Sequence, residues 1–420
     1  MTNWSKFGQR FTRRTGAREL MDDLGSAMAS QRPVCMLGGG NPAHIPELEN
    51  LFRDELRALL EDDQEYRRML GNYPVPAGEE RFRSLLADLL VREYGLQVSA
   101  RNIALTNGSQ SGFFLLFNLL AGAHADGDLK KVLLPLTPEY IGYSDVGLEK
   151  GMLRALRPTI EFLPEQQFKY HLNMQELEIA DDIAAVCVSR PTNPTGNVLT
   201  DAELAGLAER AQAKNVPLII DNAYGLPFPQ ILFTETTLHW DTNTILCMSL
   251  SKLGLPGIRT GIIVAREEIV DAIASMNSVL SLAVPSFGAV LLSDMVASGR
   301  ILDISRDIVR PFYAARMKNA LDCAHEALAG LPYHVHKPEG ALFLWLWFPD
   351  LPISSGELYE RLKARDVLVL SGHNFFPGLQ GDWRHRHECL RVTYTQDAES
   401  VRKGFQAIAE EVRKAFDGSS

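Results

Sequence analysis

The chain has 420 residues, of which 46% are hydrophobic and 22% charged, a composition typical of a globular protein that excludes a disordered chain. Its length exceeds the size at which one hydrophobic core stops growing, so we expect two domains. The formal net charge of -10 argues against binding of nucleic acid, which requires clustered Lys and Arg side chains.

The cysteines and the apolar runs of the sequence indicate the compartment. The five cysteines are odd in number and scattered, and no pair has metal-ligand spacing, so we expect reduced thiols and no bound metal. The sequence opens at Met1 without a basic-then-apolar leader. No uncharged apolar run reaches the roughly 18 to 20 residues that a membrane-spanning helix needs. We therefore expect a cytoplasmic protein without a membrane partner.

Short apolar, β-branched runs alternate with helical periodicity from about residue 46 to residue 330. This pattern is typical of an α/β domain with a largely parallel sheet. Six runs are expected to form buried strands: 102–106, 131–134, 184–189, 217–221, 244–249 and 260–265. Between two of them, Thr200 and Glu203 have the spacing of a capping box, which predicts a helix that ends near Asn215.

The pattern changes after about residue 331. An apolar run at 341–348 is followed by helix-like segments at 354–365 and 399–416. The sequence thus predicts an N-terminal segment at 1–45 that packs with a small α+β domain at 331–420, and a large domain at 46–330. Because no flexible linker separates the two domains, we expect a site between them.

Polar residues follow four of the expected strands, at the sheet edge where ligands bind in parallel α/β proteins. The segment 107–112, Asn-Gly-Ser-Gln-Ser-Gly, precedes an apolar helix-like stretch at 113–120. Small residues at a helix N-terminus favour a phosphate site. The segment 190–197 holds two prolines and a glycine and presents Asn193 as a hydrogen-bond donor, although a plain turn would explain the same residues.

Asp221 ends a very apolar strand, and Tyr224 follows three residues later. A buried carboxylate is unfavourable unless it is paired. Asp221 is therefore either a capping residue or the partner of a positively charged ring nitrogen, in which case Tyr224 could donate to an oxygen on the same ring.

Lys252 lies in a loop of small residues, flanked by apolar side chains. A lysine that is removed from solvent near another cation loses its proton readily and forms imines. Ser249, Ser251 and Arg259 of the same segment would suit a phosphate group.

Together and in this order, the four segments resemble the fold-type I pyridoxal-phosphate aminotransferases of class I and II, over nearly the whole chain. Three further runs are similar to those members of the family that pass an amino group between valine and pyruvate: 36–42, 138–143 and 372–378. The resemblance implies a large domain with a mostly parallel seven-stranded sheet flanked by helices, and a smaller α+β domain.

The resemblance also implies a role for each site residue. Lys252 would form the Schiff base with pyridoxal 5'-phosphate and act as the proton-transfer base, while Asp221 pairs with the pyridine nitrogen. Asn193 and Tyr224 would contact the ring oxygen, and Tyr140 would stack on the ring. The phosphate would be bound by five residues, one of them from the partner subunit of a homodimer: Ser109, Gln110, Ser249, Arg259 and the partner-contributed Tyr73.

The substrate carboxylate would be bound by Arg391, beside Asn193 and the backbone of Gly39 or Gly40. The implied activity is a ping-pong exchange of an amino group between a small neutral amino acid and a 2-oxo acid. Among substrate pairs, the resemblance favours valine with pyruvate, which would give 3-methyl-2-oxobutanoate and alanine. An aminotransferase of other substrate range and a pyridoxal-phosphate β-lyase or decarboxylase remain open alternatives.

Two other classes fit the sequence poorly. A non-catalytic regulator on this fold would carry a DNA-binding domain, and about 45 residues before the large domain are too few for one. A nucleotide-binding dehydrogenase would need a glycine fingerprint after the first strand, which this sequence lacks.

Overall fold

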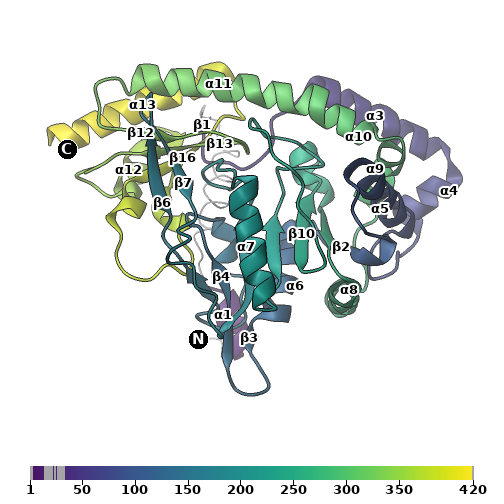
Figure 1. Cartoon of the computed structure of the whole chain (residues 1–420). Helices are drawn as coiled ribbons and strands as arrows, with labels where there is room; N and C mark the ends of the chain where they lie inside the picture. Colours follow the sequence, from purple (N-terminus) through teal and green to yellow (C-terminus); the bar gives the residue numbers. More distant parts are fainter. Residues whose placement is uncertain (1–2, 14–21, 23–24, 26–33, 419–420) are drawn as a thin grey trace.

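Two β-sheets with helices packed against them form most of the computed structural model, which describes residues 3–13, 22, 25 and 34–418 (Figure 1). Two short strands, β1 (Cys35–Met36) and β14 (Val367–Leu368), form a separate parallel pair. Within the described residues, no helix combines the length and the apolar character needed to cross a bilayer.

The first sheet contains all six strands that the sequence predicts. Its order is β2 (Ile103–Asn107), β11 (Thr260–Val264), β10 (Thr244–Ser249), β9 (Leu218–Asp221), β8 (Ile183–Ser189), β4 (Leu129–Leu134) and β3 (Gly122–Ala123), with β5 (Leu153–Ala155) also paired to β4. The strands β10, β9, β8, β4 and β5 are parallel, whereas β11 runs antiparallel to both of its neighbours.

Seven strands form the body of this sheet, as the resemblance implies, and the two-residue strand β3 adds an eighth through an antiparallel pair with the start of β4. A run of two residues is too short to show the alternation or the apolar character from which strands are predicted.

Because helices cover the first sheet, the strands β9, β10 and β11 are buried along their whole length. The helices of this part of the chain are α3 (Pro46–Glu61), α4 (Asp63–Tyr66), α5 (Glu80–Tyr94), α6 (Gly108–Leu120), α7 (Asp201–Ala213), α8 (Glu267–Ser281), α9 (Phe287–Ala297) and α10 (Arg300–Ile304). Helix α7 begins with the predicted capping box, in which Thr200 and Glu203 each accept a hydrogen bond from the backbone N–H of the other.

The second sheet joins segments far apart in the sequence. Its order is β15 (Leu370–Ser371), β16 (Cys389–Thr393), β13 (Phe343–Trp347), β12 (His334–His336), β7 (Gln167–His171) and β6 (Thr159–Leu163). The hairpin β6–β7 therefore adds to the C-terminal strands, although it precedes residue 330. The domain boundaries at residues 45 and 330 stay predictions.

Three helices accompany the second sheet: α11 (Arg310–Ala327), α12 (Ser355–Lys363) and α13 (Ala398–Asp417). Figure 1 shows that the long helix α11 runs from the side of α3 and α10 to α13, against which it packs. The short helix α1 (Lys6–Phe11) lies near β3 and β4 in this view.

The parallel strands bring polar residues to one edge of the first sheet. In the register of the sheet, Asp221 at the end of β9 pairs with Ser189 at the end of β8 and with Cys247 of β10. The first turn of α6 follows β2 at the same edge, so side chains from several strand ends meet there.

Candidate active site

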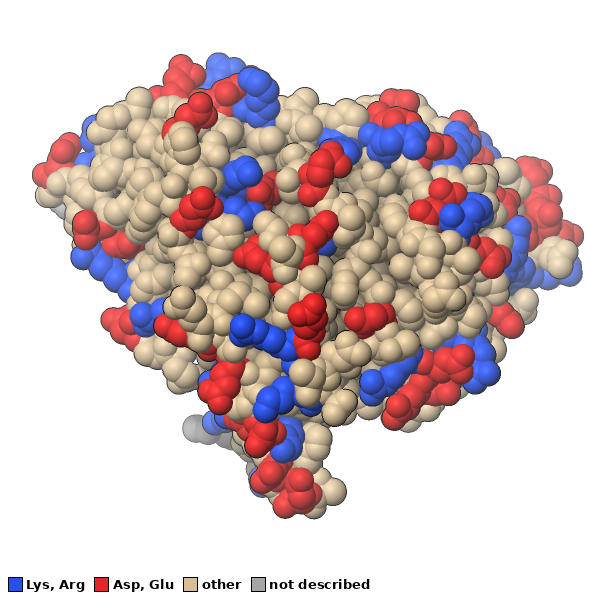
Figure 2. Space-filling model, in the orientation of Figure 1, with Lys and Arg blue, Asp and Glu red and all other residues tan. Residues whose placement is uncertain are grey.

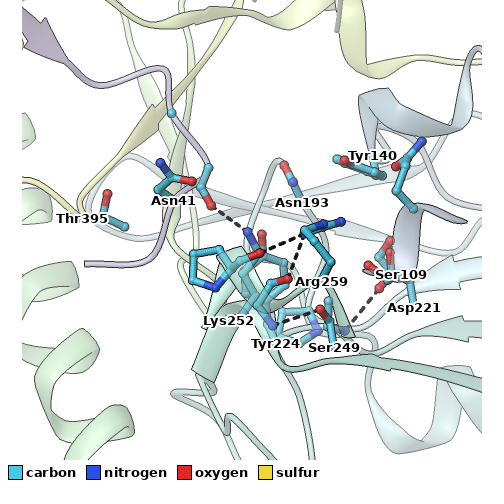
Figure 3. A pocket seen from close by; sticks show the side chains of 18 of the residues that line it. Asn41, Ser109, Tyr140, Asn193, Asp221, Tyr224, Ser249, Lys252, Arg259 and Thr395 are labelled. Carbon is cyan, nitrogen blue, oxygen red and sulfur yellow. Dashed lines mark hydrogen bonds between the residues drawn. The ribbon is translucent and has the colours of Figure 1, made fainter. Parts of the chain in front are cut away.

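A cavity of about 510 Å³ opens at this edge of the first sheet. Figure 3 shows side chains from the strand ends pointing into it, together with residues of the segment 36–41. Twelve of the residues to which the sequence analysis gives a possible role line this cavity: Gly39, Gly40, Ser109, Gln110, Tyr140, Asn193, Asp221, Tyr224, Ser249, Ser251, Lys252 and Arg259.

Lys252 lies in the short 3₁₀ turn Ser251–Leu253 that follows β10. Its Nζ atom donates a hydrogen bond to the Gly40 carbonyl oxygen at 2.6 Å. Burial, together with the nearby cations Arg391 and Arg259, lowers the pKa of Lys252 to about 8. No carboxylate among the described residues forms an ion pair with Lys252, so the amine faces the cavity as a weakly basic nucleophile.

Asp221 lies 9% exposed at the floor of the cavity. Its Oδ2 atom accepts a hydrogen bond from the Tyr143 hydroxyl at 2.7 Å, and Oδ1 accepts one from the backbone N–H of Ala223 at 3.2 Å. Burial raises the pKa of Asp221 to about 6, whereas these two donors and Lys252 act in the opposite direction. A cationic ligand above Asp221 would complete the pairing of this carboxylate.

The start of α6 and Arg259 form a cradle for an anion. No side chain caps the N-terminus of α6, so the N–H groups of its first turn remain available to a ligand. Arg259 lies beside this turn, because a Cβ atom at Gly108, where φ is +76°, would come within 2.1 Å of its Nη2 atom. Ser251 accepts a hydrogen bond from Arg259 at 3.4 Å, and no carboxylate of the described residues pairs with this guanidinium.

Arg391 is a second cation without a carboxylate partner among the described residues, and it is only 3% exposed. Nη1 donates to Asn193 Oδ1 at 2.8 Å, and Nη2 donates to the Gly38 carbonyl at 2.6 Å. The guanidinium lies 4.0 Å from the centre of the Phe343 ring. Burial lowers the pKa of Arg391 to about 10, so the group remains charged at neutral pH.

Three further residues that line the cavity, Tyr140, Tyr224 and Gln110, make contacts that can be named. Tyr140 packs edge-on against Tyr143, with 5.4 Å between ring centres. Tyr224 is buried, and Lys252 Nζ lies 5.6 Å from the centre of its ring. The Gln110 side chain donates to the Gly142 carbonyl at 3.0 Å, so its amide nitrogen holds the loop that bears Tyr140.

Tyr73 lies elsewhere on this chain. Its side chain is 83% exposed, and it does not line the cavity. Tyr73 is therefore not among the residues that form the cavity of this chain.

Sequence reasoning assigned no role to Ser189, which lines the cavity, or to Glu139 and Tyr143, which lie behind the lining. Tyr143 hydrogen-bonds to Asp221, and Ser189 lies between Tyr143 and Glu139. The sequence feature that could have pointed to Glu139 and Tyr143 is the acid and the phenol in the segment that follows the expected strand at 131–134. Asn41 also lines the cavity and lies in the run 36–42 without an assigned role, whereas the lining residues Thr395 and Gln396 had no distinguishing pattern.

Comparison with known proteins agrees with this geometry. The model of the family "Aminotransferase class I and II" matches residues 37–408. The chain is 49% identical to a valine–pyruvate aminotransferase of Escherichia coli (strain K12), over 98% of this chain and 99% of that protein.

Two solved structures share the whole architecture. A putative amino-acid aminotransferase from Psychrobacter arcticum 273-4 is 47% identical, covers 100% of both chains and has a TM-score of 0.97. A valine–pyruvate aminotransferase from Salmonella typhimurium LT2 is 46% identical, with 96% of this chain and 100% of that chain covered and a TM-score of 0.89. The chain belongs to the class I and II aminotransferase family, whose cofactor is pyridoxal 5'-phosphate.

Proposed function

We propose that this chain exchanges an amino group between valine and pyruvate, giving 3-methyl-2-oxobutanoate and alanine by a ping-pong mechanism. The observation that carries the proposal is one cavity faced by Lys252 and Asp221, with the buried Arg391 behind Asn193. The similarity to the Escherichia coli valine–pyruvate aminotransferase, which extends over nearly the full length of both chains, supports this choice of substrates.

The residues present fit pyridoxal 5'-phosphate. The uncapped start of α6 and the unpaired Arg259 suit the phosphate, and the buried Asp221 suits the pyridine nitrogen. Lys252 would hold the cofactor covalently, Tyr140 would cover the ring, and Asn193 and Tyr224 would contact the ring oxygen. The phosphate would also contact the following residues of this chain: Ser109, Gln110 and Ser249.

In the proposed reaction, Lys252 moves the proton. Bound pyridoxal phosphate supplies an electron sink for the pair left when the substrate Cα loses its proton. Lys252 Nζ takes that proton, and the lowering of its pKa to about 8 leaves a useful fraction of neutral amine near neutral pH. Asp221 holds a proton on the ring nitrogen, because its hydrogen bonds from Tyr143 and Ala223 favour the charged carboxylate.

Arg391 orients the substrate through its carboxylate. Nη1 and Nη2 each use one N–H on Asn193 and Gly38 and keep a second, while the buried Nε has no hydrogen-bond partner in the described part of the chain. A carboxylate would satisfy these donors in a bidentate geometry. The oxygen of Asn193 is engaged by Arg391, so its amide nitrogen is the group left to donate into the cavity.

The cavity favours a small neutral side chain. Its charged lining residues, within the part of the chain that is described, are Asp221, Lys252 and Arg259. With Lys252 and Arg259 assigned to the cofactor, no described lining residue offers a cation to a side-chain carboxylate. Apolar side chains line the cavity as well: Met36, Pro191, Ala223 and Pro256.

We also propose a homodimer in which Tyr73 reaches the phosphate bound by the partner subunit. Tyr73 and the apolar residues Val279, Leu280 and Leu282 at the end of α8 are all more than half exposed. Asn277 of α8 donates to the Pro76 carbonyl at 3.0 Å, which links the two exposed segments. Such apolar surface is typical of a protein interface.

The surface and the cysteines support a cytoplasmic protein with small-molecule substrates. All five cysteines are free thiols, as expected in a reducing compartment. Figure 2 shows Lys and Arg interspersed with Asp and Glu over the face in view, without the continuous basic stripe that nucleic acids require.

The proposed activity can be tested by product analysis. The purified protein, supplied with pyridoxal phosphate, valine and pyruvate, should produce 3-methyl-2-oxobutanoate and alanine in equal amounts. Aspartate with 2-oxoglutarate should react at least about tenfold more slowly, since a buried charge without a partner is costly. Release of carbon dioxide or ammonia without alanine would instead indicate a decarboxylase or a lyase.

A further inference from the structure

A second carboxyl group lies beneath the proposed site. Glu139 has no exposed surface, and it precedes Tyr140 in the segment after β4. Oε1 accepts a hydrogen bond from the Ser189 backbone N–H at 2.8 Å, and Oε2 accepts one from the Tyr140 N–H at 3.2 Å. No lysine, arginine or histidine of the described chain forms an ion pair with Glu139.

Glu139 is connected to Asp221 through two hydroxyl groups. Glu139 Oε2 lies 2.5 Å from Ser189 Oγ, which lies 3.3 Å from the Tyr143 hydroxyl oxygen. The same hydroxyl donates to Asp221 Oδ2 at 2.7 Å. Three contacts thus join the two carboxyl groups in one row.

The number of protons available to the hydrogen bonds of this row depends on whether Glu139 is ionised or neutral. Ser189 and Tyr143 each bring one hydroxyl proton. If Glu139 is ionised, Ser189 donates to Glu139 and Tyr143 donates to Asp221, so no proton remains for the contact between the two hydroxyls. If Glu139 is neutral, its proton goes to Ser189, the Ser189 proton goes to Tyr143 and the Tyr143 proton goes to Asp221. Every contact then has one donor, and every donor points toward Asp221.

We propose that Glu139 is a positioning residue held as a neutral acid, which fixes the direction of the Ser189 and Tyr143 hydroxyls so that Tyr143 donates to Asp221. The proposal rests on the proposed role of Asp221 as partner of the pyridine nitrogen. In this arrangement Glu139 keeps the negative charge of the site on Asp221 alone.

The charges around Glu139 agree with a neutral acid. Burial raises the pKa of Glu139 to about 8, and the negative charge of Asp221 adds to this effect, whereas the hydrogen bonds from Ser189 and Tyr140 oppose it. The other titratable groups nearby, among the described residues, are Tyr140, Tyr143 and Cys187, and burial raises the pKa of all three, so none supplies a charge. Two carboxylates in one buried row would repel each other.

The protonation of Glu139 can be measured without catalysis. Infrared difference spectra of the apoprotein, wild type minus E139Q, should show at pH 7 the carbonyl band of a neutral carboxylic acid. The band should disappear as the pH rises above about 8. The matched control is E411Q, because Glu411 pairs with Arg365 and Lys414, which lower its pKa, and it should contribute no such band. A spectrum without the neutral band in wild type would overturn the proposal.

The positioning role needs a second pair of variants. E139Q keeps one donor and one acceptor and should bind the cofactor within about twofold of wild type, whereas E139L removes both and should weaken binding about tenfold. In E139Q, the visible absorbance of the bound cofactor should depend on pH as it does in wild type at pH values below 8. In E139L, the pH dependence of this absorbance should shift. If E139L retains wild-type affinity and titration, Glu139 does not act on Asp221.

These measurements separate the two hypotheses. If the neutral-acid band is present and E139L alters the cofactor spectrum while no alanine forms from valine and pyruvate, the proposed substrates are wrong and the role of Glu139 stands. Normal transamination without the band would contradict the role of Glu139 alone.

Discussion

Two lysines of this chain are withdrawn from solvent in different ways. Lys169 on β7 is 5% exposed, forms an ion pair with the buried Glu339 and donates to the Val198 carbonyl at 2.9 Å. Lys252 faces the cavity, and the Gly40 carbonyl is its only hydrogen-bond partner within the described part of the chain. The first lysine is fully paired within the protein, whereas the second is left for a ligand.

The difference shows how to tell structural from functional charges in this fold. A buried cation with a carboxylate partner is compensated within the chain, and here it fastens the second sheet to the segment after Asn193. Lys252, Arg259 and Arg391 have no such partner among the described residues. In the proposed function, each marks a position where the cofactor or the substrate would supply the negative charge or the reactive group.

The largest effect is expected for Lys252→Met, which removes the proposed cofactor lysine and the proposed proton-transfer base together. Turnover of valine with pyruvate should fall by a factor of about 10⁴ or more. The melting temperature of the apoprotein at pH 7 should rise. Wild-type Lys252 has a folded-state pKa of about 8, lowered from 10.5, so its charged form destabilises the fold fully below pH 8 and progressively less up to pH 10.5.

Calorimetry and kinetics on the same preparation of this variant check both statements. A lower melting temperature with nearly normal turnover would make Lys252 a structural residue like Lys169.

Asp221→Asn should lower kcat by about a hundredfold or more. An amide cannot stabilise the proton on the ring nitrogen, and the loss of a preorganised charge at a reacting centre has effects of this order. Steady-state kinetics with saturating cofactor measures the loss. Tyr143→Phe, which removes only the donor to Asp221, is the graded control and should show a smaller decrease. Rates near wild type in Asp221→Asn would reassign Asp221 to capping.

Lys169→Met is the counterpart of the Lys252 variant and should act on stability. It leaves Glu339 buried without its main partner, which should cost about 3 kcal/mol in the free energy of unfolding. This figure lies at the low end for a buried pair, because Lys337 still lies 3.0 Å from Glu339. Denaturant titration gives the value. An unchanged midpoint would remove the distinction drawn between the two lysines.

Arg391→Lys should retain the cofactor but lower kcat/KM for both amino and oxo acids by about tenfold or more. An ammonium cannot reproduce the bidentate contact of a guanidinium, and a charge-assisted hydrogen bond contributes about 1.5 to 3 kcal/mol. Kinetics and melting temperature are measured together. A loss of stability with unchanged kinetics would show that Arg391 serves only to hold Asn193 and Gly38.

The parts of the site that lie at strand ends could be predicted from the sequence. Parallel strands bring their carboxyl ends to one edge, so Asn193, Asp221 and Lys252 follow from apolar runs and the polar residues after them. Glu139 and Tyr143 could not be assigned in this way. Their contacts depend on how a short turn packs beneath β9, and no periodicity encodes that packing.

Long-range pairing also limits what the sequence reveals. The hairpin of β6 and β7 follows the strand β5 of the first sheet. Its strand β7 nevertheless pairs in parallel with β12, where Val335 lies opposite Gln167, 168 residues earlier in the chain. The direction of the Gln110 side chain is a similar case, because its partner Gly142 lies in another loop. Such contacts are set by tertiary packing and leave no local pattern.

The central claim is that Lys252 is the lysine left unpaired for the cofactor. The most direct test is reduction of the protein with borohydride in the presence of pyridoxal phosphate, followed by peptide mapping by mass spectrometry. We expect one stable phosphopyridoxyl group per chain, on Lys252, and none on Lys169. A modification confined to other lysines, or an equal yield in the Lys252→Met variant, would contradict the claim.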